Sequence, residues 1–125
     1  DGNTLYVAEI MKRHIRAWHR QADDSFIAGQ AWPMRMGADN IEIDEAGNLW
    51  TAGHPNILAF PAHAADPAKL SPSMASMIDP TTNEVKEIFY SAGDDISASS
   101  VAAYSQGTLV IGAVFEEHVL VCSNQ

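Results

Sequence analysis

The sequence is short of basic residues, cysteines and long hydrophobic runs. Seven of its 125 residues are Lys or Arg, against 16 Asp or Glu, and the formal net charge is −9. Because affinity for nucleic acid comes largely from basic side chains, we expect no nucleic-acid partner. No stretch reaches the roughly 18 consecutive apolar residues of a membrane span, so we expect no such span in this segment. The single cysteine, Cys122, is either a small buried hydrophobe or half of a disulfide whose partner lies outside the chain.

Helical periodicity is also scarce, whereas short runs rich in β-branched and aromatic residues are frequent. Turn-forming residues such as Asp-Gly, Ala-Gly-Asn and Gln-Gly separate these runs. The pattern therefore indicates an all-β protein. Its expected strands are TLYVAEI, HIRAWHR, FIAGQAW, NIEID, NLWTAG, NILAF, EVKEIFYS, SVAAYS, TLVIGAV and HVLVC.

Three of the expected strands resemble one another: GNTLYVA (2–8), GNLWTAG (47–53) and GTLVIGA (107–113). Their leucines, Leu5, Leu49 and Leu109, are separated by 44 and 60 residues. Repeats of about 40–50 residues with four strands each are typical of β-propeller blades. The small residues that end these strands suggest that they are the inner strands of the blades. The Ala- and Pro-rich stretch 61–73 accounts for the longer interval as a surface-loop insertion.

We therefore predict that residues 1–125 are the C-terminal portion of a single β-propeller domain and hold about two and a half blades. A propeller needs at least four blades, so this chain cannot close a ring by itself. Its first and last strands would expose unpaired edges unless further blades cover them.

The hairpin expected over residues 38–56 carries polar residues at both of its ends. Asp39 and Asn40 precede one strand, and His54 follows the other. Oxygen donors at the mouth of an inner strand suit a hard cation such as calcium, which takes six to eight oxygen ligands. On local grounds alone, the pattern favours a turn at Asp39-Asn40 over a cation site, and a loop histidine at His54. Because an antiparallel hairpin brings its two ends together, the three side chains could face one pocket.

The stretch DNIEID…GNLWTAGHPN, followed by SSVAAYSQGTLVIGAVFEEHVLVC, resembles the C-terminal third of the paraoxonase/arylesterase family. The opening DGNTLYVAEIMKRHIRAW is similar to the strand pair that precedes this region in the family. The resemblance implies a six-bladed β-propeller with calcium in its central tunnel and activity on lactones and aryl esters. One departure is Gly53, which stands where animal members often carry a free cysteine.

The resemblance also implies roles for individual residues. Asp39 and Asn40 match a pair of calcium ligands, and His54 matches a pocket histidine that is a candidate general base. Ile10, Ser100 and Val114 match substrate-pocket positions. Cys122 matches a cysteine that pairs with one near the N-terminus, outside this chain, which favours a secreted or periplasmic protein.

The implied function is calcium-dependent hydrolysis of small-molecule lactones and aryl esters by the complete protein. Two alternatives stay open. One is a gluconolactonase-like or strictosidine-synthase-like propeller enzyme with the same fold and another substrate. The other is a non-catalytic propeller used as a binding module, in which Asp39-Asn40 is simply a turn.

Overall fold

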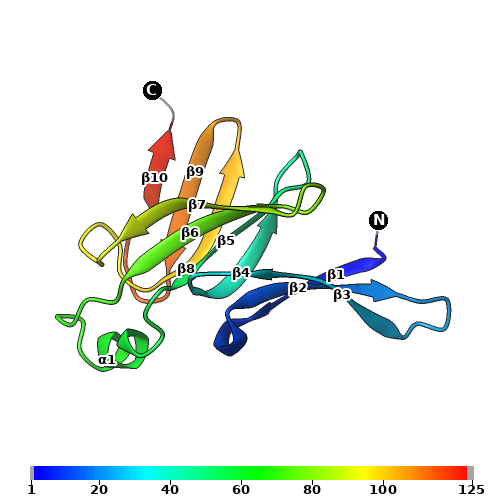
Figure 1. Cartoon of the computed structure of the whole chain (residues 1–125). Helices are drawn as coiled ribbons and strands as arrows, with labels where there is room; N and C mark the ends of the chain where they lie inside the picture. Colours follow the sequence, from blue (N-terminus) through cyan, green and yellow to red (C-terminus); the bar gives the residue numbers. More distant parts are fainter. Residues whose placement is uncertain (1, 124–125) are drawn as a thin grey trace.

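A computed structural model describes residues 2–123, which form three antiparallel β-sheets with the four-stranded sheet in the middle (Figure 1). The first sheet has the order β1-β2-β3, with strands β1 (Thr4–Glu9), β2 (His14–Arg20) and β3 (Phe26–Pro33). The middle sheet has the order β4-β5-β6-β7, with strands β4 (Gly37–Ile43), β5 (Leu49–His54), β6 (Ser73–Asp79) and β7 (Glu84–Ser91). The last sheet has the order β10-β9-β8, with strands β8 (Ser99–Ser105), β9 (Thr108–Ala113) and β10 (Leu120–Ser123). The all-β, partial-propeller fold is thus confirmed.

Two short helices connect strands. The 3-10 helix η1 (Ile10–Lys12) joins β1 to β2, and α1 (Ala59–Ala65) lies between β5 and β6. Within residues 2–123, no helix has the length and hydrophobicity needed to cross a membrane.

The segment between β5 and β6 differs from its sequence-based prediction. The expected strand NILAF (56–60) is wrong, because these residues form a turn and the beginning of α1. The stretch 61–73 holds the rest of α1 and the connection into β6, and His63 and Ser71 within it are buried. Strand β6 was not predicted, because its sequence SMASMID alternates weakly and is buried on both faces.

The three similar stretches are β1, β5 and β9, but the expectation that they are inner strands is wrong. In the middle sheet the edge strands are β4 and β7, and β5 lies between β4 and β6. Strand β4 contacts β1 of the first sheet and β8 of the last sheet, so the three sheets converge on the β4 and β8 edges. The repeat therefore marks the strand next to the inner edge.

Two hydrophobic cores hold the sheets together, one on each face of the middle sheet. The core against the first sheet contains Ile15, Trp32, Met36 and Leu49. The core against the last sheet contains Trp50, Ile96, Ala102, Leu109 and Ile111. Because successive β5 side chains enter opposite cores, all six residues of this strand are buried.

The β4–β5 turn is stabilised by the carboxylate of Asp44. Its oxygens accept hydrogen bonds from the Ala46 and Asn48 backbone N–H groups, the Asn48 side chain and Trp50 Nε1, at 2.8–2.9 Å. Burial alone would raise the pKa of Asp44, but the hydrogen bonds from Trp50, Asn48 and Ala46 outweigh it and lower the pKa below the usual 3.8. The ring of Trp50 stacks on Tyr104 at 4.6 Å, so the turn also fixes a contact with the last sheet.

We predict that Asp44→Ala in the complete protein lowers the free energy of unfolding at pH 7 by about 1–2 kcal/mol, because several donors lose a charged acceptor. Chemical denaturation measures the change, and Glu45→Ala in the same turn is the control, with an expected loss below about 0.5 kcal/mol. Since the folded-state pKa is lowered, the contribution of Asp44 is present at pH 7 and is lost as the pH falls through that pKa. An Asp44→Ala protein as stable as the wild type at pH 7 would contradict this role.

Candidate functional site

The strands that carry the candidate site residues begin or end at the same end of the sheets. Gly37 at the start of β4 pairs with His54 at the end of β5, and Ser99 at the start of β8 pairs with Ala113 at the end of β9. At the end of β1, Ile10 lies so close to Gly37 that a Cβ on this glycine would stand 2.8 Å from Ile10 Cγ2. The structure therefore gathers Ile10, Asp39, Asn40, His54, Ser100 and Val114 at one end of the fold.

Asp39 and Asn40 lie inside β4, and not before a strand as expected, because they occupy a β-bulge. Ala38 pairs with Gly53 and Ile41 with Thr51, so one extra residue is inserted in β4. The insertion changes the alternation of the strand: Ala38 and Ile41 both pack on the core between the first two sheets. The strands approach closely here, since a Cβ on Gly53 would collide with the carbonyl oxygen of Gly37.

A second bulge in β8 faces the first. Ser99 pairs with Ala113 and Val101 with Gly112, which leaves Ser100 as the extra residue. The side-chain Nδ2 of Asn40 donates a hydrogen bond of 3.1 Å to the carbonyl oxygen of Ser100. The amide nitrogen is thus engaged with β8, and Oδ1 has no hydrogen-bond partner among the described residues.

His54 ends β5 next to the β4 bulge, since it pairs with Gly37 and the preceding Gly53 pairs with Ala38. Its side chain is 5% exposed, and Nδ1 is buried without a hydrogen-bond partner among the described residues. Burial lowers the pKa of His54 below its usual 6.5, and the Asp39 carboxylate partly offsets this by raising it. The structure therefore brings His54 close enough to Asp39 for their charges to interact, and burial of the imidazole favours its neutral form.

Aromatic side chains that the sequence did not single out cover His54. The ring of Phe60, from α1, lies 4.6 Å from the His54 ring, and Phe115 stacks on Phe60 at 5.6 Å. His63 of α1 contacts Phe115 at 5.8 Å and bonds through Nδ1 to the Lys69 carbonyl, in keeping with a structural histidine. Phe60 had been assigned to a strand, so its position over the site could not be deduced from the sequence.

The remaining predicted residues lie at the rim or away from the site. Val114 follows β9, is 44% exposed, and donates its backbone N–H to the Ala98 carbonyl at 3.2 Å. Cys122 lies in β10, packs on the core between the last two sheets and is a free thiol. The predicted disulfide, whose partner would lie outside the chain, stays a prediction.

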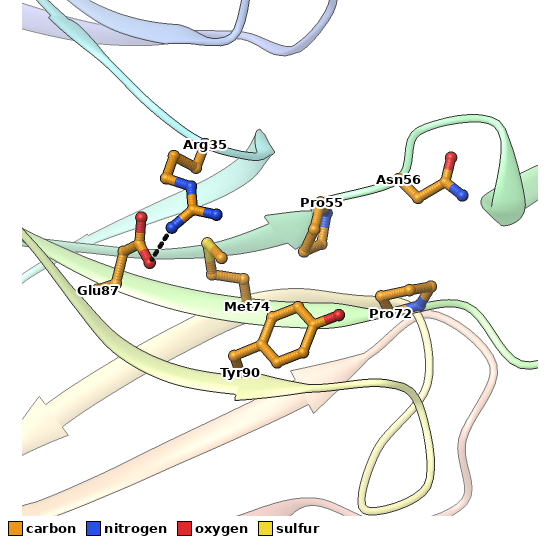
Figure 2. A pocket seen from close by; sticks show the side chains of 7 residues that line it. All are labelled: Arg35, Pro55, Asn56, Pro72, Met74, Glu87 and Tyr90. Atoms are coloured by element: carbon orange, nitrogen blue, oxygen red, sulfur yellow. Dashed lines mark hydrogen bonds and ion pairs between the residues drawn. The ribbon is translucent and has the colours of Figure 1, made fainter.

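A separate open hollow of about 590 Å³ lies beside the loop that follows His54 (Figure 2). The Arg35–Glu87 ion pair, at 3.2 Å, crosses one end of it, and Pro55, Met74 and Tyr90 point into it. None of the six candidate site residues lines this hollow.

The loop beside the hollow is held in place by Arg13 of the β1–β2 connection. Its guanidinium donates to the carbonyl oxygens of Arg35 at 2.9 Å and Pro55 at 3.1 Å. Arg13 thereby ties the residue after His54 to the connection that carries Ile10.

We predict that Asp39→Asn in the calcium-free complete protein lowers the pKa of His54 further, because a neighbouring negative charge that favours the imidazolium is lost. The pH dependence of the His54 ring signals in NMR spectra, assigned with His54→Gln, measures the change. Asp44→Asn, at the far end of the same hairpin, is the control and should leave the pKa unchanged. A constant pKa in Asp39→Asn would show that the two side chains do not interact, and a pKa that rises would contradict the expected sign.

Comparison with known proteins agrees with this architecture. The arylesterase family model matches residues 1–123. Serum paraoxonase/arylesterase 1 of Homo sapiens is 27% identical over 119 residues, which cover 94% of this chain and 34% of the relative. Serum paraoxonase/arylesterase 2 of Gallus gallus is also 27% identical over 119 residues, covering 92% and 33%. The chain spans about a third of the length of these curated relatives, and it belongs to the arylesterase family.

Proposed function

We propose that this chain is the C-terminal part of a calcium-dependent hydrolase of lactones and aryl esters, and that Asp39 and Asn40 are two of its calcium ligands. Membership of the arylesterase family supports ester hydrolysis as the reaction class. The observation that carries the assignment to this end of the fold is the Asn40–Ser100 hydrogen bond. It fixes the Asn40 amide with its nitrogen toward β8, next to a carboxylate and a buried imidazole whose pKa burial lowers.

The donor set at the β4 bulge fits a hard cation. A carboxylate and an amide oxygen are ligands that calcium prefers, and there is no thiol beside them to favour a softer metal. Within the described part of the chain, no three His, Cys, Asp or Glu side chains are grouped so that they could hold a metal. Asp39 and Asn40 would therefore contribute only part of a coordination shell of six to eight oxygens.

Each residue of the site has a task that its surroundings support. When bound, calcium would stabilise negative charge on the substrate carbonyl oxygen as water attacks the carbonyl carbon. Asp39 and Asn40 would bind and orient the cation. His54, neutral because burial lowers its pKa, could accept a proton from the attacking water, and it is the candidate general base of this chain. Phe60 and Phe115 would exclude bulk water from one side of the imidazole.

Substitution of Asn40 in the complete protein tests the proposal. We expect Asn40→Ala to weaken calcium binding at least about tenfold, because one ligand oxygen is lost, and to lower calcium-dependent hydrolysis of an aryl acetate and a five-membered lactone. Asn40→Asp keeps a ligand oxygen but loses the donor to the Ser100 carbonyl, so it should weaken binding less than Asn40→Ala. Titration calorimetry and initial rates measure the two effects.

Asn48→Ala is the matched control for this test. Asn48 lies in the turn at the far end of the same hairpin, where its side chain donates to Asp44. Loss of the Asn48 side chain should lower the free energy of unfolding of the protein and leave its calcium affinity unchanged. Unchanged calcium affinity and unchanged hydrolysis in Asn40→Ala would rule out the ligand assignment.

We further expect that residues 1–125, expressed alone, have no calcium-dependent esterase activity. Two neighbouring ligands would leave most of the calcium coordination shell to water. The edge strands β1 and β10 also expose apolar side chains, among them Leu5 and Val121. An initial-rate assay of the isolated segment with and without calcium measures this. Robust calcium-dependent turnover would show that the segment holds a complete site.

A further inference from the structure

Two consecutive residues of β8 contact the two strands of the β4–β5 hairpin, both at the end opposite its turn. Ser99 Oγ donates a hydrogen bond of 3.2 Å to the carbonyl oxygen of Gly53, the residue before His54, with the Met74 carbonyl as a more distant second acceptor at 3.5 Å. The carbonyl oxygen of the next residue, Ser100, accepts the bond from Asn40. The start of β8 thus contacts both strands that carry the candidate site.

The hairpin needs this second support because its own pairing is interrupted. Between Ala38 and Ile41 the β4 bulge breaks the regular register with β5, and Asp39 and Asn40 lie in the break. The β4–β5 ladder alone therefore does not fix the side chain of Asn40 relative to His54. The bonds from Ser99 and Ser100 connect the two residues through a neighbouring sheet.

Ser99 is itself held rigidly. It is fully buried, and its backbone N–H donates to Ser73 Oγ, also fully buried, at 3.0 Å. Two residues earlier, Ser97 Oγ accepts the Ser71 N–H at 2.8 Å and donates to the Ser71 carbonyl at 3.2 Å. The starts of β6 and β8, which belong to different sheets, are thus connected by serine hydroxyls together with one backbone bond, from the Ala98 N–H to the Ser71 carbonyl at 3.1 Å.

We propose that Ser99, supported by Ser73, is a positioning residue that sets the placement of His54 relative to Asn40. Its hydroxyl acts through the Gly53 carbonyl and touches neither substrate nor cation. For the catalytic readout, the proposal rests on the proposed function. A displacement of the imidazole by a fraction of an ångström would lower turnover more than substrate binding.

The test compares Ser99→Ala, Ser73→Ala and Ser91→Ala in the complete protein. Ser91 is the matched control: it is buried, and its hydroxyl oxygen accepts the Gly93 and Asp95 N–H groups at 3.1 and 3.3 Å, in the loop after β7. We expect Ser99→Ala to lower kcat about tenfold with less than a twofold change in KM, and to shift the NMR titration of His54. Ser73→Ala should act in the same direction, and Ser91→Ala should change neither quantity. Ser99→Thr, which keeps the hydroxyl, should restore kcat toward the wild type.

The two readouts separate this inference from the proposed function. A wild-type protein without calcium-dependent hydrolysis would overturn the proposed function, while a His54 titration that moves in Ser99→Ala would still support positioning. An active wild type whose Ser99→Ala variant matches Ser91→Ala in kcat and in the His54 titration would overturn the positioning role. If Ser99→Ala does not fold, Ser73→Ala is judged by the same two criteria.

Discussion

The contact between the bulges of β4 and β8 is the constraint on which the arrangement of this end of the molecule depends. Two inner-edge strands from different sheets approach each other where each has one residue too many for regular pairing. Polar side chains and serine hydroxyls join them there, through the Asn40–Ser100 and Ser99–Gly53 bonds. The two hydrophobic cores hold the outer sheets against the middle sheet. The few polar bonds hold β8 against β4 and β5 at the end where the candidate site lies.

Most of the strands could be predicted from the sequence because their apolar residues alternate and clear turn residues separate them. Strand β7 was predicted with its observed ends, and the β4–β5 hairpin was predicted as a unit. Strand β6 was not, since it is buried on both faces and four of its seven residues are Ser, Ala or Asp. Helix α1 was missed because its seven residues, with a proline among them, carry no periodic signal of their own.

Only the contacts of the candidate site within the β4–β5 hairpin could be predicted from the sequence. A hairpin brings its ends together, and the structure does place Asp39 near His54. Whether they bind calcium stays a proposal. The bulge, the cover of Phe60 and Phe115 and the role of Ser99 depend on contacts between segments far apart in the chain. In the sequence alone, Ser97, Ser99 and Ser100 are simply small polar residues near the start of a strand.

The bulge in β4 has a consequence for how this segment can change in evolution. Because Ala38 pairs with Gly53 and Ile41 with Thr51 on either side of the bulge, deleting a single residue at Asp39-Asn40 would restore regular pairing and leave Ala38 and Ile41 facing the same core. Replacing a side chain there would leave the register intact. The packing of the strand on the core thus depends on neither residue, and the bulge serves to hold two polar side chains where regular pairing has room for one.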